Sequence, residues 1–80
     1  MANQANDFKE RGNKLFQAQR YEEAVAAYAK AIMHNPYEPT FFTNRALCWI
    51  NLKQWDRAED DCRKALEIEK KNVKVRFIDN

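Results

Sequence analysis

The chain has 80 residues, enough for one small domain in the range where a single hydrophobic core is marginal. Hydrophobic residues make up 45% and charged residues 32%, which is typical of a folded globular chain and excludes a disordered one. A net charge of +2 is too small to indicate nucleic acid or an anionic membrane as a partner, and no apolar run approaches the ~18 residues of a membrane-spanning helix. Because the N-terminus also lacks an apolar signal segment, we expect a cytoplasmic domain with reduced cysteines.

The two halves of the chain repeat one another with an offset of 34 residues. The offset places Phe8 on Phe42, Arg11 on Arg45, Leu15 on Trp49, Ala24 on Ala58 and Ala31 on Ala65. Within each half the apolar residues recur at helical spacing, and such a period indicates helix pairs that stack as repeats. We therefore expect a single domain over residues 1–80, with one repeat at about 5–38, a second at about 39–72 and a partial third helix at 73–80.

The first repeat is expected to hold helices at about residues 6–18 and 21–34. A glycine inside a helix, here Gly12, costs about 1 kcal/mol relative to alanine, so we expect the partner helix to approach it closely. The other apolar positions of the first helix are Phe8, Leu15 and Phe16, and those of the second are Ala24, Val25, Tyr28, Ala31 and Ile32. Pro36 ends the second helix because the residue before a proline is disfavoured in the α region.

The second repeat is expected to hold helices at about residues 39–52 and 55–68, with Pro39 in the first turn, where its missing N–H is not needed. The residues expected to point inward from its second helix are Trp55, Ala58, Cys62, Ala65 and Leu66. Residues 70–72 are expected to form a polar turn. After that turn, residues 73–80 would begin a third helix, either the first helix of another repeat or a capping helix.

The small, large and terminating residues of the first repeat resemble those of the tetratricopeptide repeat (TPR). These residues are Gly12, Leu15, Tyr21, Ala24, Tyr28, Ala31 and Pro36, and the second repeat matches at Ala46, Trp49, Ala58, Cys62 and Ala65. The resemblance implies an all-α fold, in which antiparallel helix-turn-helix units stack into a right-handed α-solenoid. It also implies that the first helix of each unit lines a concave groove.

The segments 9–13 and 43–46 resemble the carboxylate-clamp repeats of co-chaperones, and the second repeat is similar to that of the U-box co-chaperone ubiquitin ligases. This resemblance implies a protein-interaction adaptor whose partner is the C-terminal Glu-Glu-Val-Asp tail of a cytosolic heat-shock chaperone. No U-box is found in the 80 residues, so ligase activity is not carried over and we expect no enzymatic activity.

The expected groove residues are those that break the repeat. The carboxylate clamp would consist of Lys9, Asn13, Asn44 and Lys74, and the apolar pocket of Phe16, Leu47, Phe77 and Ile78. Lysine supplies charge-assisted hydrogen bonds to carboxylates, and asparagine amides add directional donors. Asn51 and Ile78 stand where clamp proteins commonly have cations, so we expect an affinity on the order of 10 μM or weaker.

Other functions are less well supported by the residues. His34, Cys48 and Cys62 have no partners at ligand or catalytic spacing, so the sequence predicts no metal, cofactor or nucleophile. The main alternative is a structural module that self-associates, with a homodimer formed through the incomplete and apolar third repeat. A basic surface that contacts RNA is a weaker third option.

Overall fold

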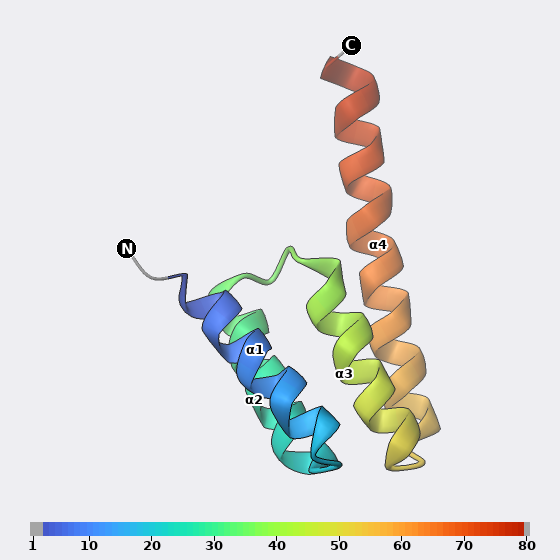
Figure 1. Cartoon of the computed structure of the whole chain (residues 1–80). Coiled ribbons are helices and arrows are strands. Elements are labelled where there is room, and N and C mark those ends of the chain that lie inside the picture. Colours follow the sequence, from blue (N-terminus) through green and yellow to red (C-terminus); the bar gives the residue numbers. More distant parts are fainter. Residues whose placement is uncertain (1–2, 80) are drawn as a thin grey trace.

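The structure is a computed structural model that describes the backbone of residues 3–79 and the side chains of residues 3–72. Helices α1 (Gln4–Gln17), α2 (Tyr21–His34), α3 (Pro39–Asn51) and α4 (Trp55–Asp79) are the only regular elements in this part of the chain. Helix α1 packs against α2, α2 against α3, and α3 against α4, so that two helical hairpins lie side by side (Figure 1). The predicted all-α repeat fold is confirmed.

The two hairpin turns have the same backbone conformation. Gln19 and Lys53, which are 34 positions apart, both adopt the left-handed conformation, with φ values of 63° and 61°. The next residue in each turn donates its N–H back into the preceding helix, to Leu15 O at 2.9 Å and to Trp49 O at 2.8 Å. This pattern satisfies carbonyls that the helix end would otherwise leave unpaired. The repeat therefore extends from the side chains to the backbone of the turns.

Helices α1 and α3 each begin at a residue whose side chain caps the helix. Asn3 caps α1, since its side chain accepts a hydrogen bond from the Asn6 N–H at 3.3 Å. Glu38 caps α3 in the same way by accepting from the Thr40 N–H at 3.3 Å, and Pro39 occupies the first turn as expected. The predicted bounds of α2 are confirmed, and those of α1 and α3 differ from the prediction by one or two residues at the ends.

Gly12 lies where α1 and α2 approach one another closely. A Cβ atom added to it would lie 2.6 Å from Cε1 of Tyr28, closer than any real side-chain contact allows. Tyr28 itself is buried, and it packs with Ala24 and with Cys48 of α3. The expected close approach of the partner helix is confirmed, and it is the Tyr28 ring that requires the glycine.

The inward face of α4 differs from the prediction. Ala58, Ala65 and Ile68 are buried with Asp61, whereas the predicted inward residues Trp55, Cys62 and Leu66 are exposed. These three are the counterparts of Tyr21, Tyr28 and Ile32 in α2. Tyr21 packs on Phe16 of α1, while Tyr28 and Ile32 pack in clusters that contain residues of α3. Among the described residues no element covers this face of α4, so the prediction was wrong for these three residues and right for Ala58 and Ala65.

The polar turn expected at residues 70–72 is also absent. Helix α4 continues through these residues to Asp79, so the segment expected to begin a third helix is an extension of α4. In the first repeat Asn35 and Pro36 stop α2, whereas Glu69 and Lys70 occupy the equivalent positions. Both of these residues are good helix formers, so nothing in the local sequence ends the helix there.

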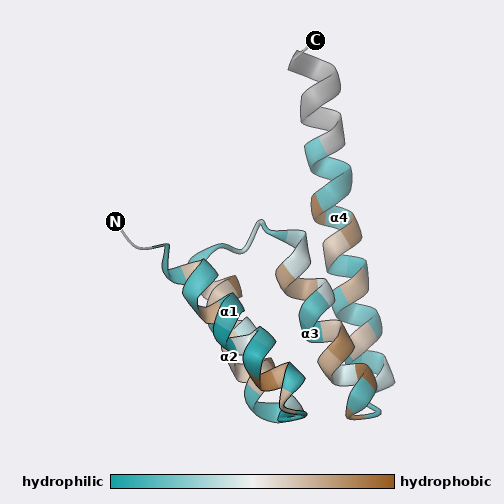
Figure 2. Ribbon diagram, viewed as in Figure 1, coloured by the Kyte–Doolittle hydropathy of each residue, from teal (hydrophilic) through white to brown (hydrophobic). Residues whose placement is uncertain are grey.

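In the ribbon coloured by residue hydropathy, hydrophobic and hydrophilic segments alternate along each helix (Figure 2), as expected for helices with one apolar face. Among the described residues, no helix combines the length and the apolar character needed to cross a bilayer.

Candidate functional site

Helices α1, α2 and α3 surround a hollow of about 190 Å³, which we call the junction hollow because it lies between the two repeats. Its lining consists of Asn13, Phe16, Gln17, Tyr28, Asn44 and Leu47. Asn13 and Phe16 are one turn apart on α1, and Asn44 and Leu47 are one turn apart on α3. The structure therefore brings together four of the predicted groove residues.

The orientation of the Asn13 amide is set by a buried tyrosine. The Tyr28 hydroxyl donates a hydrogen bond of 2.5 Å to Oδ1 of Asn13. Burial, with a smaller contribution from the neighbouring Cys48, raises the pKa of Tyr28 to about 12, so this hydroxyl stays a donor at neutral pH. Because Oδ1 is engaged, the Asn13 NH₂ group is the end left to donate to a ligand.

Tyr28 and Gln17 were not predicted as site residues. Tyr28 was assigned to the core, where it does pack, but a buried tyrosine hydroxyl requires a hydrogen-bond partner. That requirement was the available signal, and Asn13 on the facing helix was the nearest polar candidate. Gln17 follows Phe16 at the end of α1, and no sequence pattern marked it.

Apolar side chains border the junction hollow beside the two amides. Leu47 is 49% exposed although it is a large aliphatic residue, and Asn44 is half-buried. Phe16 is half-buried and packs edge-on against Tyr21, with ring centroids 5.3 Å apart. The arrangement offers amide donors next to apolar contact surface, which suits an extended peptide with a polar end.

Other predicted site residues lie elsewhere. Lys9 is one turn before Asn13 on α1 but does not line the junction hollow. The side chains of Lys74, Phe77 and Ile78 lie outside the described residues. Asn51, at the place of a family lysine, donates from Nδ2 to the Leu47 carbonyl at 2.9 Å and is thus bound to its own helix.

Helical hairpins that stack with a constant offset along the chain define a helical-repeat fold. Family models described as tetratricopeptide repeat match residues 5–38 and residues 39–72. The chain belongs to the tetratricopeptide repeat family, whose fold is a protein-interaction fold, and the resemblance found in the sequence is confirmed.

Similar proteins include two that are much longer than this chain. E3 ubiquitin-protein ligase CHIP of Arabidopsis thaliana is 40% identical over 74 residues, which cover 92% of this chain and 27% of the relative. Mitochondrial import receptor subunit TOM70 of Homo sapiens is 40% identical over 74 residues, covering 86% of this chain and 12% of the relative. The chain thus spans about a quarter or less of these curated relatives.

A solved structure with a bound peptide is also similar. It is titled the first TPR of Spaghetti (RPAP3) bound to HSP90 peptide SRMEEVD. The TM-score is 0.82 at 39% sequence identity, and the match covers 84% of this chain and 55% of the solved one. The likeness therefore concerns both fold and sequence.

Proposed function

We propose that this chain is an adaptor that captures the acidic C-terminal tail of a heat-shock chaperone at the junction hollow. The observation that carries the proposal is the convergence of Asn13, Phe16, Asn44 and Leu47 on one hollow between the repeats. The similar RPAP3 domain, solved with a peptide ending in Glu-Glu-Val-Asp, supports the choice of ligand. A cytosolic chaperone as partner implies a cytoplasmic location.

Each group would have a separate role in binding. The NH₂ groups of Asn13 and Asn44 donate to the terminal carboxylate or to the peptide backbone. Lys9, one turn before Asn13 on α1, contributes positive charge and charge-assisted hydrogen bonds to carboxylates. Phe16 and Leu47 contact an apolar side chain further upstream in the peptide. With Asn51 bound to its own helix, cations are few, so we expect a Kd on the order of 10 μM or weaker.

The test is calorimetric titration with an acetylated Glu-Glu-Val-Asp peptide, compared with the same peptide amidated at its C-terminus. We expect the free acid to bind at least roughly tenfold more tightly, and its affinity to fall with salt. Asn44→Ala and Lys9→Ala should each weaken binding, whereas Lys64→Ala, which removes the same charge from an exposed position on α4, should not. Equal affinity for acid and amide peptides would overturn the proposal.

A second candidate function rests on α4. Trp55 is 61% exposed and Leu66 is 68% exposed, and with Cys62 they form one apolar stripe, which we call the α4 face. We propose, as the alternative, that two copies of the chain cover each other's α4 faces and that the domain serves as an oligomerisation module. Exposed apolar stripes of this kind mark protein contact sites.

Sedimentation and thermal unfolding distinguish this alternative. Self-association predicts a melting temperature that rises with protein concentration, and Leu66→Gln should remove that dependence. Lys70→Gln, an exposed change on the same helix, is the matched control. A monomer at millimolar concentration with a melting temperature independent of dilution would contradict it.

A further inference from the structure

The second repeat contains a buried polar cluster that joins α3 to α4. Arg45 donates from Nε to Asp61 Oδ2 at 2.8 Å and from Nη2 to Asp61 Oδ1 at 2.7 Å. Trp49 Nε1 donates to the same Oδ2 at 3.0 Å. The Asp61 side chain is only 8% exposed, so this carboxylate is shielded from water and has three donors.

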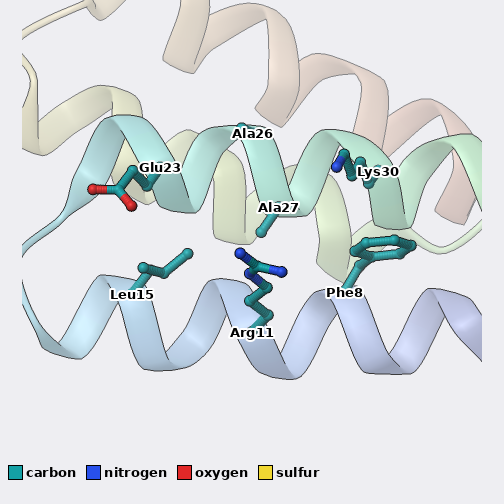
Figure 3. Close-up of a pocket in the computed structure, with 7 residues that line it drawn as sticks. All are labelled: Phe8, Arg11, Leu15, Glu23, Ala26, Ala27 and Lys30. Carbon is teal, nitrogen blue, oxygen red and sulfur yellow. The ribbon is translucent and has the colours of Figure 1, made fainter.

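The first repeat has the arginine of this cluster without its carboxylate. Arg11 is the counterpart of Arg45, but Ala27 stands at the place of Asp61 and Leu15 at the place of Trp49. The missing side-chain volume leaves a hollow of about 180 Å³ between α1 and α2, which we call the Arg11 hollow (Figure 3). Its lining consists of Phe8, Arg11, Leu15, Glu23, Ala26, Ala27 and Lys30.

The charged residues around the Arg11 hollow leave the Arg11 guanidinium free to bind an anion. Within the described residues Arg11 makes no ion pair. Glu23 is paired with Arg20 at 2.8 Å, and its carboxylate points away from Arg11 (Figure 3). Lys30 holds its ammonium 5.5 Å from the centre of the Phe8 ring, so a second cation borders the same hollow. An anion entering here would meet two cations above apolar walls.

We propose that the Arg11 hollow binds an acidic side chain, Asp or Glu, presented by a partner polypeptide. The incoming carboxylate takes the place that Asp61 holds in the second repeat and pairs with the planar Arg11 fork. The hollow is smaller than the ~300–1,000 Å³ of typical small-molecule sites, which favours a single side chain over a free metabolite.

This site is separate from the junction hollow. Arg11 and Asn13 are two positions apart on α1, which turns their side chains about 200° from one another around the helix axis. The two hollows share no lining residue. A partner bound at one therefore leaves the other open, and the inference stands independently of tail binding.

The test is an NMR titration of the whole chain with the blocked tripeptide acetyl-Leu-Asp-Leu-amide, which has no free terminal carboxylate for the junction hollow. We expect saturating shifts of the Arg11 Nε resonance and of the Ala27 and Lys30 amides in the millimolar range. The matching Leu-Asn-Leu peptide should bind roughly tenfold more weakly, since it lacks the charge. Equal shifts with the two peptides, or no shifts with either, would overturn the proposal.

Three variants test whether the shifts depend on Arg11 and on the open space beside Ala27. Arg11→Gln should abolish the shifts, while Arg63→Gln, an equal change of charge at an exposed position on α4, should leave them unchanged. Ala27→Asp supplies the carboxylate within the chain and should block the site, with helicity checked by circular dichroism. Binding retained in Arg11→Gln would count against the site, as would free acetate giving the same shifts at the same concentration.

Discussion

The two repeats share one backbone pattern but differ in how they treat the same arginine. In the second repeat Arg45 is paired with Asp61, which also accepts a hydrogen bond from Trp49. In the first repeat the equivalent Arg11 faces a hollow, because alanine and leucine replace the two partners. The two repeats therefore share helix positions and small packing residues. They differ at larger side chains, so the same arginine forms an internal ion pair in one repeat and borders an open hollow in the other.

We expect the junction between the repeats to lose stability at alkaline pH. Burial raises the pKa of Tyr28 to about 12 from 10.0 and that of Cys48 to about 11 from 9.0. Because both folded-state pKa values lie above the unfolded ones, the stability these groups contribute is present below pH 9 and is lost as the pH rises to 12. Each loss is at most roughly 3 kcal/mol.

Chemical unfolding followed by circular dichroism between pH 8 and 12 would measure this loss. In Cys48→Ala the decline should begin near pH 10 instead of near pH 9, because Tyr28 is then the one remaining group of this buried pair. A free energy of unfolding that stays constant across this range in the unmodified chain would show that the two groups are not shielded at the junction.

Removing the partner of Arg45 in the second repeat should lower the free energy of unfolding by more than adding a partner for Arg11 in the first repeat changes it. Asp61→Ala leaves Arg45 and the Trp49 N–H without their shared acceptor, and we expect a loss of about 3 kcal/mol. Ala27→Asp instead places a carboxylate at a buried position that borders the Arg11 hollow, where it can pair with the exposed Arg11, and should change stability by less than about 1 kcal/mol. Urea unfolding of the two variants measures both changes in the free energy of unfolding. Their order would be reversed if Arg11 already had an acidic partner.

Substitution of equivalent aliphatic residues on α2 and α4 should also have unequal effects on stability. Ile32 packs against Phe42 and Phe41, so Ile32→Gln should cost about 2 kcal/mol. Leu66→Gln changes an exposed counterpart and should stay within about 0.5 kcal/mol in dilute protein. Thermal unfolding at micromolar concentration compares them, and a large loss for Leu66→Gln would mean that the α4 face is covered in solution.

A smaller loss than for Asp61→Ala or Ile32→Gln is expected when Gly12 is changed. An alanine there improves helix propensity by about 1 kcal/mol but pushes its Cβ into the buried Tyr28 ring, so we expect a net loss of about 1 kcal/mol. Ala46→Gly is the matched change in the second repeat and should cost about 1 kcal/mol through helix propensity, with a further loss from the buried methyl group. A higher melting temperature for Gly12→Ala would show that the ring can move aside.

Local sequence determined most of the secondary structure and part of the junction hollow. The 34-residue offset, Pro36 and Pro39 placed the first three helices to within one or two residues, since periodicity, proline chemistry and capping act over one or two helical turns. Helical spacing placed Asn13 near Phe16 and Asn44 near Leu47 on their own helices, whereas the expectation that both pairs line one groove rested on the repeat register and the family resemblance.

Only the tertiary structure decided which partners these side chains meet across helices. The bond from Tyr28 to Asn13, the pairing of Arg45 with Asp61 and the open space beside Arg11 depend on distances between helices, which spacing along one helix does not encode. The exposure of Trp55 and Leu66 has the same origin. The repeat pattern predicted burial for their positions, and burial requires a neighbouring helix that no described part of the chain provides.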